Sequence, residues 1–235
     1  ASKRLNAGSL KNEGIELTLG GRPLSYRNFS WDIDVNFSKN KNIVEDLPAE
    51  ITQYNLASAY NGIQIRARNG EQIGLWGTGF ERDPDGNIVI NQNNGLRRVV
   101  TDQRFGNIYP DWTMGINNSF TYRGLTLGFL IDIRQGGVMY SGTVGALRTT
   151  GLASETAINR DKIIIDPGVI FDQAANKYIP NTVPVQSMQD FWGQFGNNTV
   201  SEGAVFDASY IKLREVVLSY ALPSSIFRNQ RFIKG

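Results

Sequence analysis

Two residue types common in enzyme active sites are missing from this sequence of 235 residues, which has no Cys and no His. Their absence excludes thiolate nucleophiles, disulfides, Ser-His-Asp triads and nearly every zinc site. Asp32 and Asp34 stand two residues apart, and paired carboxylates can act as acid and base in glycoside cleavage when the site is closed. The simpler interpretation is a solvated face that pairs with cations such as Arg134. We therefore predict that the chain is not an enzyme.

Residues 83–87, Asp-Pro-Asp-Gly-Asn, are similar to part of a calcium-binding loop. The EF-hand pattern places Gly sixth and a Glu twelfth, but here Gly86 comes three residues after Asp83 and no Glu stands at the required place. Pro-Asp-Gly between apolar segments is typical of a hairpin turn. We predict a turn here, a tight loop at the glycines around Trp76, and neither metal nor cofactor.

Aromatic residues in the two longest polar segments are the candidates for binding a ligand or a partner. Their rings are rigid and amphipathic and can serve as platforms for sugars or peptide side chains. The alternative is that most of them pack the small cores of their own loops and only one or two make outside contacts. Residues 187–190, Ser-Met-Gln-Asp, also resemble the capped start of a short helix. The candidates are Tyr54, Tyr60, Trp76, Phe80, Phe191 and Trp192.

The elements that would position these residues show strict alternation of apolar and polar side chains. Every second residue from Phe29 to Phe37 is apolar, and the residues between them are polar. This period predicts a strand with one apolar and one polar face. The same pattern predicts strands over residues 15–20, 27–39, 111–122, 125–134 and 205–222. A phase slip at Val216-Val217 predicts a β-bulge, and residues 231–235 resemble the start of another strand.

The connections between these strands alternate between short and long. Short turns are predicted at residues 20–23, 123–124 and 222–224, and two long loops at residues 40–110 and 135–204. Short periplasmic turns and long extracellular loops are typical of an outer-membrane barrel, whereas long structureless loops are uncommon in compact domains. We predict an all-β fold, an antiparallel section of a transmembrane β-barrel with long extracellular loops. Aromatic residues near the strand ends suit interfacial girdles: Trp31, Phe37, Trp112 and Tyr122.

Composition agrees with this fold class. Hydrophobic residues make up 40% of the chain, yet no apolar run approaches the roughly 20 residues of a transmembrane helix. Barrel strands need no such run, because half of each strand is polar. The net charge of +2 gives no reason to expect nucleic acid as a partner. Five strands are too few to close a barrel, since the smallest have eight, so we expect this chain to be part of a larger polypeptide.

Four segments in order along the chain resemble the C-terminal part of SusC/RagA-type TonB-dependent transporters. The most specific segment is residues 207–220, Asp-Ala-Ser-Tyr-Ile-Lys-Leu-Arg-Glu-Val-Val-Leu-Ser-Tyr. The others are residues 12–19, residues 110–112 with the two strands that follow, and residues 136–143. Together they span nearly the whole chain.

This resemblance implies a 22-stranded barrel with an N-terminal plug, in the outer membrane of a Gram-negative bacterium. It also implies import of glycan or peptide fragments driven by TonB, and a SusD-like lipoprotein lid over the extracellular mouth. Residues 1–235 would be the C-terminal part of such a barrel. The plug, the region that contacts TonB and the final strand would lie outside it.

One alternative of a different class is a secreted β-sandwich that recognises glycans through loop aromatics. A sandwich has short connections at both ends and a core of its own. The two long loops on one side favour the transporter instead.

Overall fold

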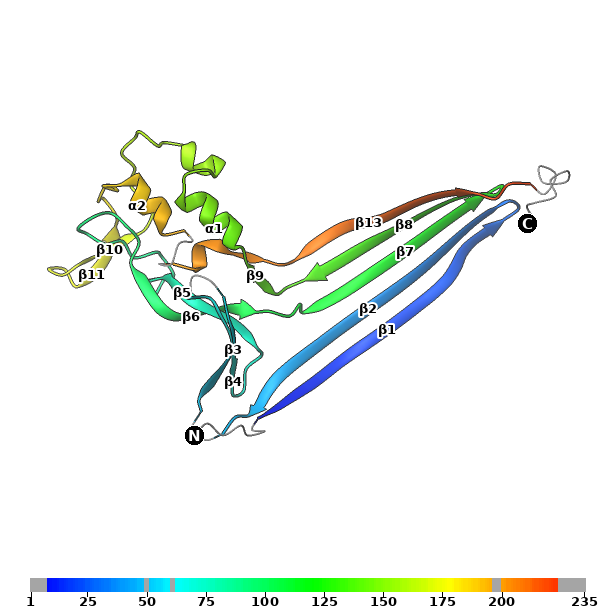
Figure 1. The fold of residues 1–235 in the computed structure, drawn as a ribbon, viewed down its shortest axis with the longest axis horizontal. Coiled ribbons are helices and arrows are strands. Elements are labelled where there is room, and N and C mark those ends of the chain that lie inside the picture. Colours follow the sequence, from blue (N-terminus) through cyan, green and yellow to red (C-terminus); the bar gives the residue numbers. More distant parts are fainter. Residues whose placement is uncertain (1–7, 49–50, 60–61, 196–199, 224–235) are drawn as a thin grey trace. The chain divides into compact units, whose positions relative to one another are not determined.

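The computed structural model describes residues 8–48, 51–59, 62–195 and 200–223. The chain forms two compact units. The sheet unit contains residues 12–41, 110–136 and 208–235, and the loop unit contains residues 1–11, 42–109 and 137–207. Figure 1 shows the long strands of the first and the mixed elements of the second. The start of another strand, predicted at residues 231–235, lies outside the described residues.

The sheet unit is one antiparallel sheet of five strands in the order β1-β2-β7-β8-β13. Its strands are β1 (Ser9–Tyr26), β2 (Phe29–Asp46), β7 (Trp112–Tyr122), β8 (Leu125–Gln135) and β13 (Tyr210–Tyr220). The predicted strands over residues 111–122 and 125–134 are confirmed almost to the residue, and so is the turn at Arg123 and Gly124. Both turn residues have positive φ, 48° and 85°, as a I′ hairpin turn requires.

The predicted turn at residues 20–23 is wrong, because β1 continues to Tyr26 and turns at Arg27 and Asn28. Arg22 Nε lies 2.7 Å from Asp32 Oδ1, so the hairpin continues beyond the two glycines. Pro23 is tolerated because β1 is an edge strand of this sheet, where a residue without an N–H can face away from its neighbour. The partner of Asp32 is therefore Arg22 rather than the predicted Arg134.

The predicted strand over residues 205–222 is two strands. β12 (Val205–Asp207) pairs with β9 (Val138–Tyr140), while β13 pairs with β8. The bulge also lies earlier than predicted, because the register shifts between Leu213 and Glu215 and leaves Arg214 as the extra residue. Ser224, the last residue of the predicted turn at 222–224, lies outside the described residues.

Rows of paired residues across the sheet separate an apolar from a polar face. Val35 stands opposite Ile116, which stands opposite Ile131 and then Leu213. One position along, the row is Asn36, Gly115, Asp132 and Lys212. On the polar face Arg214 forms an ion pair with Asp132, and the hydroxyl of Tyr210 donates to the same carboxylate over 3.1 Å. The charges of β13 thus lie at the polar face and the bulge.

Among the residues that the structure describes, no second layer covers the apolar face of this sheet. Leu213 and Leu218 are 64% and 68% exposed. Aromatic rings do stack across the strands, with Trp31 and Phe120 centroids 5.6 Å apart and those of Phe120 and Phe129 6.0 Å apart. A β-sandwich would bury this face under another sheet, so the single layer disagrees with the sandwich alternative.

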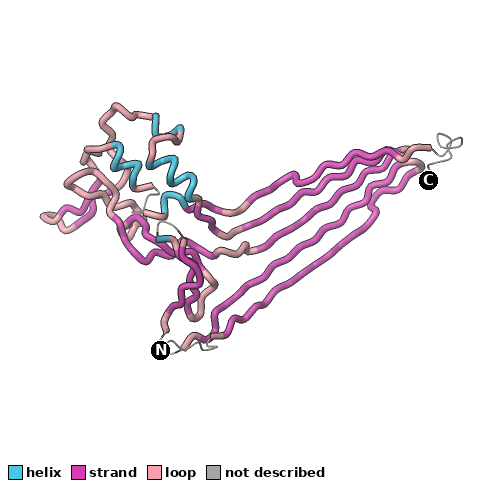
Figure 2. The backbone as a smooth tube through the Cα atoms, in the orientation of Figure 1, coloured by secondary structure: helices cyan, strands magenta, loops and turns pink. Residues whose placement is uncertain are grey.

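The loop unit is folded rather than structureless. Its largest sheet has the order β3-β4-β5-β6, and a small core of Val44, Ala67 and Ile73 includes Leu47, Ile65 and Ile108 at its edge. The helices of the described chain all lie in this unit (Figure 2). Its remaining elements include the hairpin of β10 and β11 and the 3-10 turns η2 and η3. The bounds are β3 (Gln53–Ser58), β4 (Gln64–Arg68), β5 (Gly74–Phe80), β6 (Val99–Asn107), α1 (Gly142–Thr149), η2 (Ser154–Ala157), β10 (Val169–Asp172), β11 (Lys177–Pro180), α2 (Met188–Gly193) and η3 (Glu202–Ala204).

Within the described ranges, none of the helices has both the length and the apolar character needed to cross a membrane.

Candidate functional site

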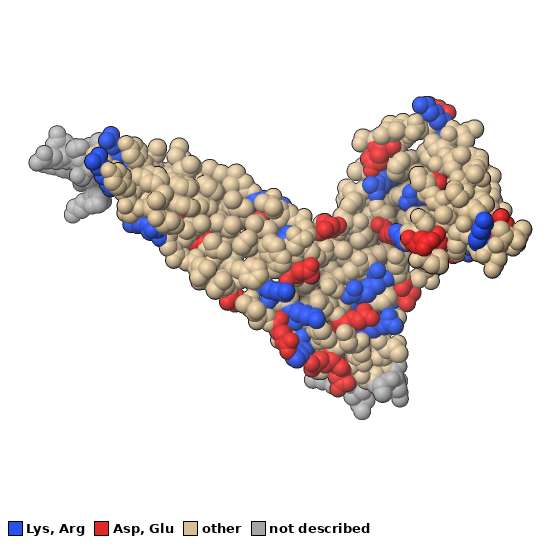
Figure 3. Space-filling view, turned by 180° about the vertical axis from the view of Figure 1, so that it is seen from behind, with Lys and Arg blue, Asp and Glu red and all other residues tan. Residues whose placement is uncertain are grey.

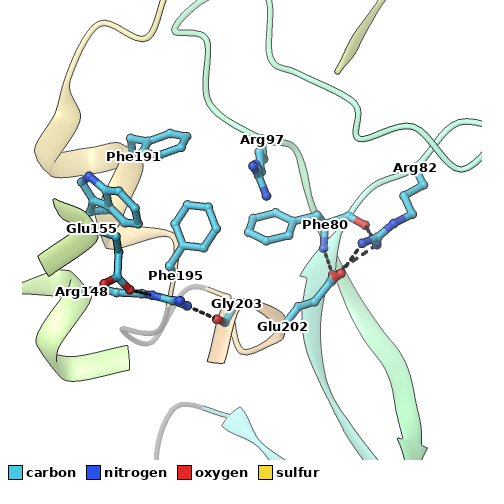
Figure 4. Close-up of a pocket in the computed structure, with 10 residues that line it drawn as sticks. Phe80, Arg82, Arg97, Arg148, Glu155, Phe191, Phe195, Glu202 and Gly203 are labelled. Atoms are coloured by element: carbon cyan, nitrogen blue, oxygen red, sulfur yellow. Dashed lines mark hydrogen bonds and ion pairs between the residues drawn. The ribbon is translucent and has the colours of Figure 1, made fainter. Parts of the chain in front are cut away.

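The loop unit contains a cavity of about 580 Å³ between the two helices on one side and β5 and η3 on the other (Figure 4). Aromatic rings, two ion pairs and the guanidinium of Arg97 form its wall. Three of the predicted aromatic residues are among the rings. Its lining residues are Phe80, Arg82, Arg97, Arg148, Glu155, Phe191, Trp192, Phe195, Glu202 and Gly203.

Helix α2 positions most of the aromatic wall. The helix starts as predicted at Ser187, whose hydroxyl accepts a hydrogen bond from the Asp190 N–H over 3.1 Å. Phe191 and Phe195 follow one turn apart, with ring centroids separated by 5.2 Å. Trp192 lies 5.4 Å from Phe195. Phe80 of β5 completes the group, 5.6 Å from Phe195.

Arg97 sits against these rings and is held from two sides. Its guanidinium carbon lies 5.0 Å from the Phe80 centroid and 4.9 Å from the Phe195 centroid. Asp166, with only 4% of its side chain exposed, accepts from Nε and Nη2 over 2.6 and 3.0 Å. The side-chain amide of Gln194 makes two hydrogen bonds to the Arg97 backbone: it accepts one from the N–H and donates one to the carbonyl. A bidentate pair against aromatic rings fixes the guanidinium in one place.

Two further ion pairs neutralise the remaining arginines of the cavity. Glu202 pairs with Arg82 and accepts a hydrogen bond from the Phe80 N–H over 2.7 Å; its hydrogen bond raises the pKa of Arg82 above the ordinary value. Arg148 Nε lies 2.9 Å from Glu155 Oε1. Hydrogen bonds from the backbone N–H of Glu155 and from Arg148 lower the pKa of Glu155. Arg148 also donates to the carbonyl of Gly203.

The cavity wall thus carries three guanidinium groups and two carboxylates, and Asp166, which does not line the cavity, balances the charge of Arg97. The balance suits a neutral ligand or a polar protein surface better than a strongly charged one. The indole Nε1 of Trp192 is buried and has no hydrogen-bond partner in the described part of the chain. Trp192 and Arg148 also line a neighbouring cavity of about 300 Å³. The arrangement offers stacking surfaces and donors for binding.

The six predicted aromatic residues fall into different surroundings. Phe80, Phe191 and Trp192 meet at the cavity. Trp76 is 4% exposed, and the guanidinium carbons of Arg66 and Arg68 lie 5.4 and 5.7 Å from the centroid of its ring. Tyr54 is 55% exposed on β3, and Tyr60 lies outside the described residues. Ligand or partner binding by these residues stays a prediction.

The sequence did not lead us to predict Phe195 or any of the charged residues of the cavity. Phe195 follows Phe191 by one helical turn, so the spacing could have revealed it. The partners Arg97 and Asp166 are 69 residues apart, and Arg82 and Glu202 are 120 apart. No local pattern predicts such pairs.

The candidate calcium loop is a turn, as predicted. Asp83 Oδ1 accepts hydrogen bonds from the backbone N–H groups of Asp85 and Asn87 over 3.0 and 2.8 Å, and Asn87 Nδ2 donates to Oδ2 over 3.0 Å. These bonds, led by the one from the Asn87 side chain, lower the pKa of Asp83. The carboxylate is thus used by its own loop. In the described residues no three acidic side chains are grouped as metal ligands would be.

Gly77 and Gly79 lie in strand β5, so the tight loop predicted at the glycines around Trp76 is wrong. They allow close packing of this strand rather than ligand binding. A Cβ at Gly77 would lie 2.9 Å from the Ser201 hydroxyl, and one at Gly79 would lie 1.6 Å from Gln103 Oε1. Both glycines therefore let β5 approach η3 and β6.

Comparison with known proteins gives relatives for nearly the whole chain, although no family model matches. TonB-dependent receptor P3 of Formosa agariphila is 25% identical over 252 residues, covering 96% of this chain and 23% of P3. TonB-dependent receptor P26 of the same organism is 26% identical over 243 residues, covering 94% of this chain and 23% of P26. The chain thus spans about a quarter of the length of these curated relatives.

Solved structures share the fold. The RagAB peptide importer in the closed-closed state matches 97% of this chain with a TM-score of 0.64 and 16% identity, over 25% of its own chain. The open-open state matches 96% with a TM-score of 0.63 and 19% identity, over 24% of its own chain. The antiparallel strands and few helices described above are therefore a RagA-like fold.

Proposed function

We propose that this chain, which its relatives group with the SusC/RagA-type TonB-dependent receptors, forms part of the wall of a transmembrane β-barrel. The barrel lies in the outer membrane of a Gram-negative bacterium, has 22 strands when complete, and imports nutrient fragments with energy supplied through TonB.

The observation that carries this proposal is the single-layer sheet with one apolar and one polar face. The apolar row Val35, Ile116, Ile131 and Leu213 crosses four strands, and Leu213 is 64% exposed. In water such a continuous apolar surface is unfavourable, whereas in a bilayer it faces hydrocarbon. The ion pairs of the polar face then line a hydrated lumen.

Strand length agrees with a membrane crossing. β7 runs from Trp112 to Tyr122, and ten steps of about 3.3 Å give roughly 33 Å. At a tilt of about 40° this length spans roughly 25 Å, the height of the apolar band of an outer-membrane barrel. Aromatic residues mark both ends of the span: Phe37 and Trp112, 6.0 Å apart, at one end, and Trp31 with Phe120 toward the other.

The loop unit supplies the extracellular surface in this proposal. The long loops, residues 40–110 and 135–204, face outward, and a SusD-like lipoprotein rests on them as a lid. The similar solved structures are those of a peptide importer; for this chain the cargo is a glycan or peptide fragment. The cavity around Trp192 contacts the cargo or the lid, because its unpartnered indole N–H and balanced charges suit a neutral polar group.

Labelling of intact cells tests the orientation. Asp85 lies in an exposed turn of the loop unit and Asn28 in an exposed turn of the sheet, and the chain has no Cys of its own. Asp85→Cys and Asn28→Cys are treated separately with a membrane-impermeant maleimide. We expect labelling of the first variant only. Labelling of the second variant alone would contradict the orientation.

Substitution of the cavity wall tests its part in import. Trp192→Ala removes a ring and the free indole N–H, so uptake or lid capture should weaken about two- to tenfold. Tyr178→Ala is the control, because it removes a ring on the β10–β11 hairpin that does not line this cavity. Wild-type uptake and wild-type lid capture in the Trp192 variant would remove the cavity from the proposal.

A further inference from the structure

The turn end of the sheet carries two arginines side by side. Arg27 lies in the β1–β2 turn and Arg123 in the β7–β8 turn. The two turns are joined directly, because the Arg123 N–H donates to the Asn28 carbonyl over 3.0 Å. The next turn position, Gly124, accepts from the Ala221 N–H over 2.8 Å. The two hairpin turns and the end of β13 therefore form one continuous rim.

Both guanidinium groups lack an anionic partner within the described residues. Each lies over the ring of the tyrosine that precedes it, with its central carbon 5.3 Å from the centroid of Tyr26 or Tyr122. Most other arginines of the described chain are paired with carboxylates, as Arg22 with Asp32 and Arg214 with Asp132.

The surroundings supply no acid either. The sequence has no Asp or Glu over residues 23–31, 118–131 and 216–222. Figure 3 shows the same composition, with blue side chains among uncharged ones at the end of the sheet at the left of that view. Within the part of the chain that the structure describes, the rim is thus cationic and has no neutralising carboxylate.

The backbone at both positions favours other residues. Arg27 has φ of 49° and Arg123 has φ of 48°. Asn, Asp and Gly suit this left-handed conformation better than Arg does, and hairpin turns prefer them. An arginine at the same unfavourable place in two adjacent turns indicates that the side chain is needed for something other than the turn.

We propose that this rim binds the phosphate headgroup of an anionic phospholipid. Guanidinium groups bind phosphate oxygens through paired N–H donors, and tyrosine rings prefer the boundary between headgroups and hydrocarbon. The apolar face begins immediately beside the rim, at Leu125 and Leu127, which are 44% and 40% exposed and so can contact the acyl chains. This continuity favours a lipid over free phosphate.

The inference rests on the proposed function, in which the short turns face the periplasm. The lipid is therefore a phospholipid of the periplasmic leaflet. The rim would fix the height of the barrel wall in the membrane at that side.

Photo-crosslinking tests the site in the intact transporter that contains this chain, reconstituted in phosphatidylcholine vesicles with a photoreactive phosphatidylglycerol. Crosslinks are localised by mass spectrometry, and we expect them in peptides that contain residues 23–31 and 118–131. Arg27→Asn with Arg123→Asn removes both guanidinium groups and places a residue suited to the backbone at each turn. Each basic side chain near an anionic surface raises the affinity slightly more than about fivefold. Because this variant loses two of them, half-saturation of the crosslinking should require about 30-fold more of the photoreactive lipid.

Matched variants make the result specific. Lys162→Asn with Lys177→Asn removes the same charge from exposed positions of the loop unit and should change nothing. Arg27→Lys with Arg123→Lys keeps the charge without the paired donors and should fall between wild type and the Asn variant. Unlabelled phosphatidylglycerol should compete, while inorganic phosphate should not. Equal crosslinking in wild type and the Asn variant, competition by inorganic phosphate, or stronger competition by lipopolysaccharide than by phosphatidylglycerol would each overturn the proposal.

Flotation of the vesicles separates this inference from the proposed function. A transporter that does not float with phosphatidylcholine vesicles contradicts the membrane-spanning wall itself. A transporter that floats, while its Asn variant keeps wild-type crosslinking, contradicts the phospholipid site alone.

Discussion

Asn118 lies on the apolar face of the sheet, where an amide is costly unless its hydrogen bonds are made. It is 7% exposed, and its Oδ1 accepts from Trp31 Nε1 over 3.2 Å. Trp31 stacks on Phe120 with ring planes only 11° apart. One indole thus satisfies the amide oxygen and restores an apolar surface around it.

Replacing Trp31 with Phe should destabilise the sheet by about 1–3 kcal/mol, because the amide oxygen is left buried and unpaired. In an Asn118→Leu background the same replacement should cost clearly less, since no polar group remains to be left unpaired. The free energy of unfolding of the intact protein, measured by urea titration in vesicles, gives both values. An equal cost in the two backgrounds would show that the hydrogen bond contributes nothing.

The candidate site could be predicted from the sequence only in part. Loop aromatics and the Ser187 cap were visible, and they led to Phe80, Phe191 and Trp192. The arginines were not, since the ion pair of Arg97 depends on a residue 69 positions away. Nor does the sequence distinguish Trp76, which is buried and contacts two arginines, from the aromatic residues at the cavity.

At the scale of elements, alternation predicts strands well where neighbours on both sides hold the strand. β7 and β8 agree with prediction for this reason, since each is paired along both edges. The prediction ended the edge strand β1 too early, because Gly20, Gly21 and Pro23 are residues typical of a turn. The fold of the loop unit could be predicted from the sequence even less, because its sheet and helices depend on contacts between distant segments.

The bulge at Arg214 corrects the phase of β13. Leu213 and Val216 share the apolar face, opposite Ile131 and Phe129, although three positions separate them. Without the extra residue the odd spacing would send one of them to the polar face. The bulge also brings Arg214 to Asp132.

Deleting Arg214 should therefore leave the faces of β13 unchanged, since Leu213 and Glu215 already stand opposite adjacent residues of β8. Deleting Val217 should be far more harmful, because either Leu218 turns to the polar face or Glu215 turns to the lipid. The fraction of intact protein that stays folded in unheated SDS measures the difference. Equal losses in both deletions would contradict the assigned bulge.

At the scale of the whole molecule, the two units carry different tasks. The sheet unit has the surfaces of a membrane wall, with apolar residues exposed on one face and ion pairs on the other. The loop unit has its own core and a cavity built from aromatic rings and balanced charges. In the proposed function, recognition belongs to the loop unit, because loop sequences and partner contacts can change without disturbing the strands.

A spin-label scan along β8 tests the central claim, that the five-stranded sheet faces lipid on one side, most directly. Each residue from Leu125 to Arg134 is replaced by a labelled cysteine in the intact protein, reconstituted in vesicles, and its collision rates with oxygen and with a water-soluble nickel complex are measured. We predict high oxygen accessibility at 125, 127, 129, 131 and 133 and low accessibility at the positions between them, with the opposite preference for nickel where the lumen is wet. Uniform low accessibility to oxygen, or nickel contact at the odd positions, would contradict a membrane-spanning wall.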